Sequence, residues 1–346
     1  MTADTSVAPA PGANARAAAI DSRSTARLRP GWITIAGKEL ADHLLSIRLY
    51  VLLVVLGIAA LIPLYFVGED VRSAASSASG YPAIFLYLFA YAPQNVNFGP
   101  LSFTVQAFIA IAAPLLGVAF GFDAVNGERH QGTLPRLLSQ PIHRDDVING
   151  KFAGGLLAIT IALVVVLAVI SGFGMLRLGI LPKADEIVRL FAWLGVTVLY
   201  VALWLAFGML LSVVIRRAAT SALVGFGVWL FVAMPFIGPL LVSLLGTFLA
   251  AGATTQAEYA STIQWVARLL PGQVYAEASA ALLRPNLTSV SASEIYSAQA
   301  QQQIPTLLSF DQSFLLVLPH IVILFALTVG CFALAYARFM RQEVRA

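Results

Sequence analysis

Six long apolar runs constrain this chain more than any other feature of its sequence. Each is close to the roughly 20 residues that an α-helix needs to cross a bilayer, and short polar stretches separate most of them. We therefore expect an all-α, polytopic membrane protein with six transmembrane helices. We place these helices at about 49–67, 103–121, 153–176, 190–214, 220–246 and 314–337.

The composition also indicates a lipid environment. Hydrophobic residues make up 59% of the 346 residues and charged residues only 11%, whereas a soluble domain has about 25% charged residues. The basic residues lie between apolar runs, which is not the pattern of a nucleic-acid-binding face. A single cysteine excludes an intrachain disulfide, and the histidines lack metal-ligand spacing, so we expect no metal site. These residues are Cys331, His43, His130, His143 and His320.

The segment before the first run divides into two parts. Residues 1–29 are rich in Ala, Ser, Pro and Arg and lack periodicity, so they are expected to form a disordered tail without the apolar core of a signal peptide. Residues 32–47 place apolar side chains at steps of three and four, which predicts an amphipathic helix lying on the membrane surface. The alternative is a helix packed on a soluble partner. The apolar positions are Ile33, Ala36, Leu40, Leu44 and Ile47.

Lysine and arginine are distributed unevenly over the segments between the runs. Six of the 21 lie in the segments that would face outward, 68–102, 177–189 and 247–313. The other fifteen lie in 1–48, 122–151, 215–219 and 338–346. The positive-inside rule then places both termini in the cytoplasm and the protein in the cytoplasmic (inner) membrane.

Three of the runs contain residues that predict irregular or close packing. Pro235, Gly238 and Pro239 should break the fifth run near its outer end. Small residues four apart, Gly117 with Gly121 and Gly208 with Ser212, should let helices of the same chain approach closely. In the outer segment 247–313, the first half is apolar enough to lie against the membrane, and the polar second half should face water. The apolar half includes Trp265, Leu269, Leu270, Pro271, Tyr275 and Leu282.

No catalytic or nucleotide-binding constellation is visible. Gly37-Lys38 and Gly150-Lys151 lack the upstream Gly and the following Ser or Thr of a phosphate-binding loop. The run interiors hold almost no ionisable residue, and neither Asp123 nor His320 has an obvious intramembrane charge partner. This disfavours an ion-coupled carrier. If ATP drives the protein, another chain binds it.

The stretch 120–151, FGFDAVNGERHQGTLPRLLSQPIHRDDVINGK, is the most informative. The chain should leave the second span at Asp123 and form a charged turn between Gly127 and Gly132. Thr133 can cap a short Leu-rich helix, 134–139, and a second helix should begin at His143 or Arg144. A short apolar helix held out in the cytoplasm is typical of a knob that docks in another protein's groove. The alternative is a loop resting on lipid headgroups.

This order of residues closely resembles permeases of the ABC-2 type, in particular the permease of the nitrous-oxide reductase maturation transporter. The matching positions are Phe122, Asp123, Gly127, Glu128, Arg129, Gly132, Thr133, Leu134, Leu137, Leu138, Ser139, Pro141, Ile142, Arg144, Gly150 and Lys151. The similarity extends more weakly over 30–346, including Pro271 and Tyr275 ahead of the last span.

The resemblance implies a permease without catalytic residues, which couples ATP hydrolysis on a separate ATPase chain to substrate export. ATP and Mg would be bound by that ATPase, and a second permease copy, identical or paralogous, would complete the transporter. The 134–139 segment becomes a cytoplasmic coupling helix. The implied coupling residues are Asp123, Glu128, Arg129, Gly132, Thr133, Leu134, Leu137, Leu138, Pro141, Arg144 and Lys151. The alternatives are a secondary carrier or channel, a membrane enzyme or scaffold, and a mechanical transducer acting on another envelope protein.

Overall fold

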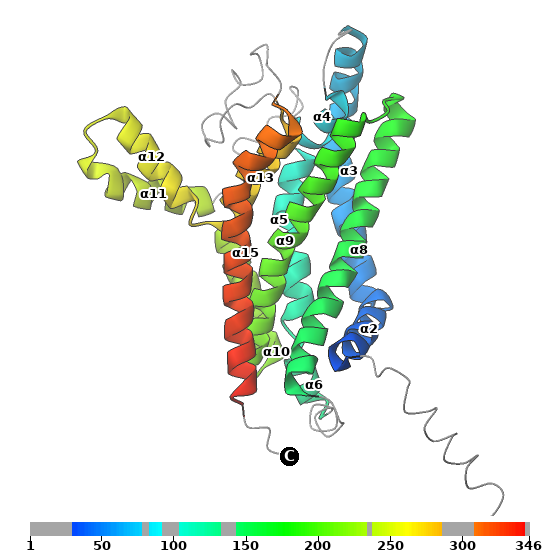
Figure 1. Ribbon diagram of the computed structural model, residues 1–346, viewed down its shortest axis with the longest axis vertical. Helices are drawn as coiled ribbons and strands as arrows, with labels where there is room; N and C mark the ends of the chain where they lie inside the picture. Colours follow the sequence, from blue (N-terminus) through cyan, green and yellow to red (C-terminus); the bar gives the residue numbers. More distant parts are fainter. Residues whose placement is uncertain are drawn as a thin grey trace, which may run out of the picture.

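The computed structural model describes residues 30–77, 83–91, 104–132, 143–233, 237–285 and 308–342. Within these ranges the chain forms helices and the turns between them, with no strand, so the predicted all-α class is confirmed. The long helices stand side by side along one axis and form a bundle (Figure 1). We call the lower end in that view, with α2, α6 and the end of α15, the α6 end, and the opposite end the α13 end.

Among the described residues, five helices are long and apolar enough to cross a membrane. The qualifying stretches, Ile47–Gly68, Val105–His130, Arg144–Arg177, Ala184–Val214 and Phe310–Met340, match five of the six predicted runs. Their apolar outer surfaces are exposed along the bundle, as expected of side chains that face lipid. The helices are α3 (Ile47–Ser77), α5 (Val105–Gly121), α8 (Arg144–Leu178), α9 (Ala184–Val214) and α15 (Phe310–Met340).

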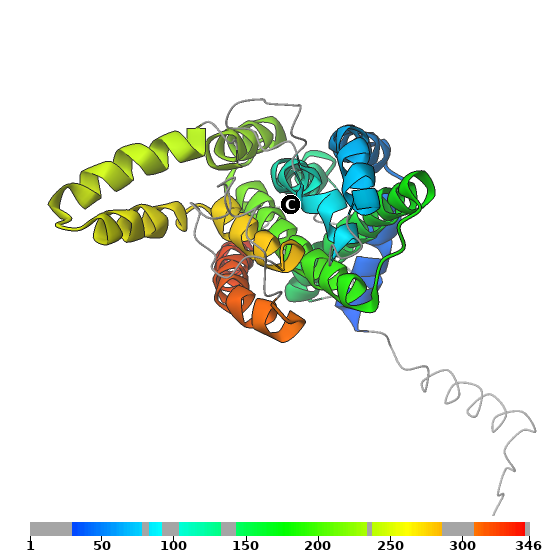
Figure 2. The ribbon, with the colours of Figure 1, turned by 90° about the horizontal axis from the view of Figure 1, so that it is seen from above.

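The predicted fifth run is divided between two helices. α10 (Ala218–Ala233) runs along the bundle, and α11 (Ile237–Leu249) leaves it sideways together with α12 (Gln256–Ala267), as Figures 1 and 2 show. The run is divided as predicted, between Ala233 and Ile237. Pro235 lies outside the described residues, and Gly238 and Pro239 belong to the first turn of α11, where proline is tolerated. Each piece is shorter than a typical span. The count of six spans therefore stays a prediction.

Close packing between α5 and α9 forms the centre of the bundle. A Cβ atom added at Gly121 would lie 2.7 Å from the carbonyl oxygen of Leu205 and 2.9 Å from backbone atoms of Gly208. Only glycine allows two helix backbones to approach so closely. The prediction that these small residues pack helices of one chain is confirmed.

The predicted amphipathic segment forms α2 (Gly31–Leu44), which lies across the beginning of α8. Its buried residues are Ile35 and Ala36, and a Cβ atom at Gly150 of α8 would lie 2.6 Å from that of Ile35. The exposed side chain of Ile33 belongs to the face that we expected to be apolar. The segment is helical over 31–44, and Ile47 belongs instead to α3. Its amphipathic character and its contact with the membrane surface stay predictions.

The outer segment departs from the expectation at α13 (Pro271–Leu283). We expected Tyr275 and Leu282 to lie against the membrane, but both are buried among α13, α9, α15 and α5. Tyr275 stacks on Tyr200 with ring centroids 4.5 Å apart. The prediction is wrong for α13 because lipid and the protein interior are both apolar, so hydropathy does not separate them. Trp265 and Leu269 are exposed, and 286–307 lies outside the described residues.

Candidate functional site

The site begins where the chain leaves α5. After a turn over 122–125 it forms α6 (Asn126–His130), so the predicted charged turn is in fact one turn of helix. The backbone N–H groups of Val125 and Asn126 donate to Ser212 Oγ at 3.0 and 3.1 Å, and the Asn126 amide donates to the Ile215 carbonyl at 2.7 Å. α6 is therefore attached to the end of α9. Gly132, with φ of 67°, follows α6 in the left-handed conformation that glycine accepts easily.

Lys151 joins three helices at the α6 end. Its ammonium nitrogen lies 2.8 Å from a carboxylate oxygen of Glu39 on α2 and 2.8 Å from one of Glu128 on α6. The side chains of Lys151, Glu39 and Glu128 are only 4%, 12% and 16% exposed. Charges taken out of water are stable only when they are closely paired, so each member depends on the others. We call these three residues the Lys151 cluster.

Asp123 has a partner that the sequence did not reveal. Its carboxylate lies 2.5 Å from Arg48 Nη1 at the beginning of α3, and the Arg48 guanidinium lies 5.5 Å from the centroid of the Phe122 ring. The sequence showed no obvious intramembrane partner for Asp123, and the structure supplies Arg48, whose side chain is 53% exposed. The pair connects the beginning of the first long helix with the end of α5.

Gln342, just beyond α15, forms hydrogen bonds with residues on both sides of the 122–151 loop. Its side-chain oxygen accepts a hydrogen bond from the Arg129 guanidinium, and its backbone oxygen accepts one from Arg144 at 3.1 Å. Its side-chain amide donates to the Val213 carbonyl at the end of α9, at 2.8 Å. Sequence reasoning missed Gln342, because no spacing links it to the loop.

The structure describes six of the predicted loop residues; Gly132 follows α6, and the other five form three groups at the α6 end. Glu128 and Lys151 belong to the Lys151 cluster, Arg129 and Arg144 contact Gln342, and Asp123 pairs with Arg48. The second loop helix begins at Arg144 as predicted and continues as α8. Outside the described residues lie the predicted helix 134–139 and Thr133, Leu134, Leu137, Leu138 and Pro141.

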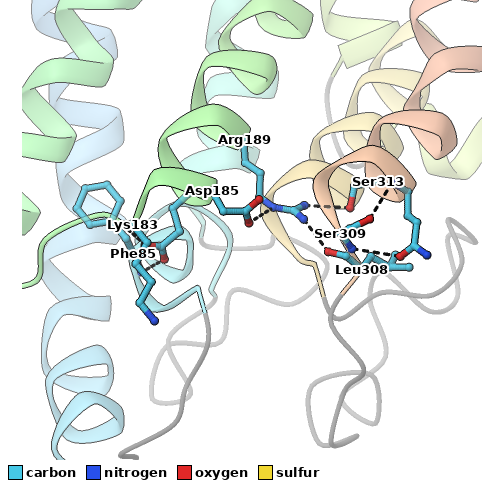
Figure 3. Close-up of polar contacts among 9 residues, drawn as sticks. Phe85, Lys183, Asp185, Arg189, Leu308, Ser309 and Ser313 are labelled. Carbon is cyan, nitrogen blue, oxygen red and sulfur yellow. Dashed lines mark hydrogen bonds and ion pairs between the residues drawn. The ribbon is translucent and has the colours of Figure 1, made fainter.

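A second polar network ties helices together at the α13 end. Arg189 of α9 donates to Asp185 at 2.8 Å, to Ser313 Oγ at 2.9 Å and to the Leu308 carbonyl at 2.7 Å (Figure 3). The Glu186 carboxylate accepts a hydrogen bond from the backbone N–H of Phe85, in the first turn of α4 (Ile84–Ala90), at 2.9 Å. These contacts attach the beginnings of α15 and α4 to the first turns of α9.

The last long helix also carries a charged contact. His320 Nε2 lies 2.9 Å from the Glu277 carboxylate of α13, which is fully buried and also 2.9 Å from Arg268 Nε. The expectation that His320 lacks a charge partner is therefore wrong. Burial raises the pKa of Glu277, but the hydrogen bonds from His320, Gln273 and Arg268 outweigh it and hold this pKa below its ordinary value. The described residues contain no group of three or more His, Cys, Asp or Glu that could hold a metal ion.

The sequence of this chain is similar to those of known transporter proteins. The family model described as "ABC-2 family transporter protein" matches residues 33–344. The "Probable ABC transporter permease protein NosY" of Pseudomonas aeruginosa is 30% identical over 221 residues, which cover 61% of this chain and 70% of that protein. The protein of the same name from Stutzerimonas stutzeri is 30% identical over 159 residues, covering 43% of this chain and 55% of the relative. The chain therefore belongs to the ABC-2 family of transporter proteins and is a membrane permease subunit of an ABC transporter.

Proposed function

We propose that this permease works in an ATP-driven exporter of the cytoplasmic membrane, with both termini in the cytoplasm. In this proposal a separate ATPase chain binds ATP and Mg²⁺, and this chain binds no cofactor. Residues 30–346 form the transmembrane domain, with 1–29 as a tail outside it. The observation that carries the proposal is the convergence of Asp123, Glu128, Arg129, Arg144 and Lys151 at one end of the bundle.

The contacts at the α6 end suggest how a push on the loop reaches the spans. A displacement of α6 moves Glu128, which is bound to Lys151 on α8 and, through Lys151, to Glu39 on α2. The Asp123–Arg48 pair carries the same displacement to α3. The contacts of the Lys151 cluster are buried and tightly packed, so they deform little and can transmit such shifts.

The transporter is proposed to contain two permease copies, identical or paralogous. Five long spans and the divided fifth run make half of an exporter pathway, and a second bundle supplies the other half. Cross-linking in native membranes should trap a species with two permeases. A transport-competent complex with one permease per ATPase pair would exclude this arrangement.

The docking role of the loop is tested by Leu137→Asp and Leu138→Asp. A charge in place of an interface leucine should remove its apolar contact and leave a carboxylate poorly solvated, which costs about 2 kcal/mol or more. We expect both variants to insert normally but to lose co-purification with the ATPase and stimulation of its ATP hydrolysis. The matched control is Leu181→Asp, at a side chain that is 73% exposed in the connection between α8 and α9. Normal binding and stimulation by both loop variants would refute the docking role.

A further inference from the structure

The C-terminal turn after α15 contacts both sides of the loop through a single residue. Arg129 lies before the middle of the loop and Arg144 after it, and Gln342 accepts a hydrogen bond from each. The bond to Arg129 uses the side chain and the bond to Arg144 uses the backbone. Gln342 thus links Arg129 and Arg144, the two ends of the loop that lie next to the bundle; we call this region the base of the loop.

Gln342 also connects this base to α9. Its amide nitrogen donates to the Val213 carbonyl at 2.8 Å, one of the last carbonyls of α9. The last four carbonyls of a helix have no partner within the helix, so a donor from outside satisfies one of them. The amide therefore uses its acceptor for the loop and its donor for α9, a division of roles that a carboxylate or an ammonium group cannot perform.

The loop is covalently continuous with α5 and α8 but not with α15. From these contacts we infer that Gln342 is a positioning residue that passes displacements of the loop to the last long helix and to the end of α9. This inference rests on the proposed coupling function and extends it to α15, which no motif in the loop implicates. The Lys151 cluster makes the corresponding connection on the other side of the loop, from α6 to α2 and α8.

Two substitutions separate the roles of the Gln342 side chain. Gln342→Ala removes the bonds to Arg129 and Val213 but keeps the backbone oxygen that Arg144 contacts. Gln342→Glu keeps an acceptor for Arg129, with a charge-assisted bond, but faces the Val213 carbonyl with an oxygen instead of a donor. Gln256→Ala makes the same chemical change at an exposed position at the beginning of α12 and serves as the control.

The measurements use the full permease–ATPase complex in lipid nanodiscs. Hydrogen exchange in peptides covering 123–132 should rise at least about threefold in Gln342→Ala, because opening of the loop base becomes easier. Exchange in these peptides should stay near wild type in Gln342→Glu and in Gln256→Ala. Permease-stimulated ATP hydrolysis should fall at least about fivefold in Gln342→Ala while co-purification of the ATPase is unchanged.

The outcomes distinguish this inference from the proposed function. Unchanged exchange in Gln342→Ala would overturn the positioning role, even if Leu137→Asp abolishes docking as expected. Increased exchange with unchanged stimulation would overturn the transmission to α15. Normal ATPase binding by both leucine variants would instead refute the docking role of the loop. The exchange result would then still test whether Gln342 holds the base of the loop in place.

Discussion

Three ionisable side chains of the bundle, Lys151, Glu277 and Arg189, are held by partners from other elements. Lys151 binds Glu39, which is 112 residues away in sequence, and Glu277 binds His320, 43 residues away. Arg189 binds Ser313, 124 residues away. Such contacts stabilise the fold only as complete sets, because removing one member leaves a charge without compensation.

The Lys151 cluster predicts a large effect of a single substitution. Lys151→Met keeps the apolar stem of the side chain but leaves Glu39 and Glu128 facing each other without a cation. We expect a loss of about 3 kcal/mol in the free energy of unfolding, seen as a lower melting temperature in detergent. Lys38→Met is the control, because Lys38 is 58% exposed and its ion pairs with Glu39 and Asp42 are long. A loss below about 1 kcal/mol in Lys151→Met would show that the cluster is not stabilising.

Glu277 predicts a dependence of stability on pH. Its pKa in the folded protein is lowered from 4.5, so its contribution is fully present above that value and is lost as the pH falls through the folded pKa. Glu277→Gln should cost about 2 kcal/mol near neutral pH. It should also flatten the decline in melting temperature below about pH 4.5. A variant that declines as steeply as wild type would assign the acid sensitivity to other carboxylates.

For single residues, the sequence predicted which side chains belong to the candidate site but not which side chains they contact. The loop motif marked Glu128, Arg129, Arg144 and Lys151, because the spacing of that motif is local. Their partners could not be predicted, since the pairing of Lys151 with Glu39 depends on how α2 crosses α8. The same reason explains why Gln342 was missed.

Among the helices, the contact of α5 with α9 predicts a steric effect. Gly121→Ala would place a methyl group 2.7 Å from the Leu205 carbonyl oxygen, a backbone atom that cannot move aside alone. We expect a loss of about 1–3 kcal/mol in the free energy of unfolding. Gly172→Ala in α8 is the control, because no atom lies within 4 Å of its added Cβ. Equal melting temperatures for the two variants would show that the bundle relaxes around Gly121.

Elements with a strong apolar signal could be predicted, and elements that depend on tertiary packing could not. The five long helices follow from length and hydropathy, and the division between α10 and α11 follows from its prolines. The position of α13 did not follow, because an apolar face suits lipid as well as a neighbouring helix. α6 is too short for a periodic pattern to show.

For the molecule as a whole, the distribution of basic residues predicts the orientation. Fifteen of the 21 lysines and arginines belong to the segments assigned to the cytoplasm. A reporter that is active only outside the cytoplasm should give no signal when it is fused after Ala346, while a cytoplasmic reporter should be fully active. Strong external activity would reverse the orientation and place the loop on the wrong side for an ATPase.

Two of the five long helices contain no proline, and α8 is the longer of them. α3, α5 and α15 contain Pro63, Pro114 and Pro319, whereas the 35 residues of α8 and the 31 residues of α9 contain none. At 1.5 Å per residue α8 is about 52 Å long, well beyond the roughly 30 Å hydrocarbon core of a bilayer. It can therefore act as a lever arm, in which a tilt of about 5° at the Arg144 end displaces the far end by about 4–5 Å. The Lys151 cluster lies two turns from the Arg144 end, so a small displacement there becomes a larger displacement at the far end of α8.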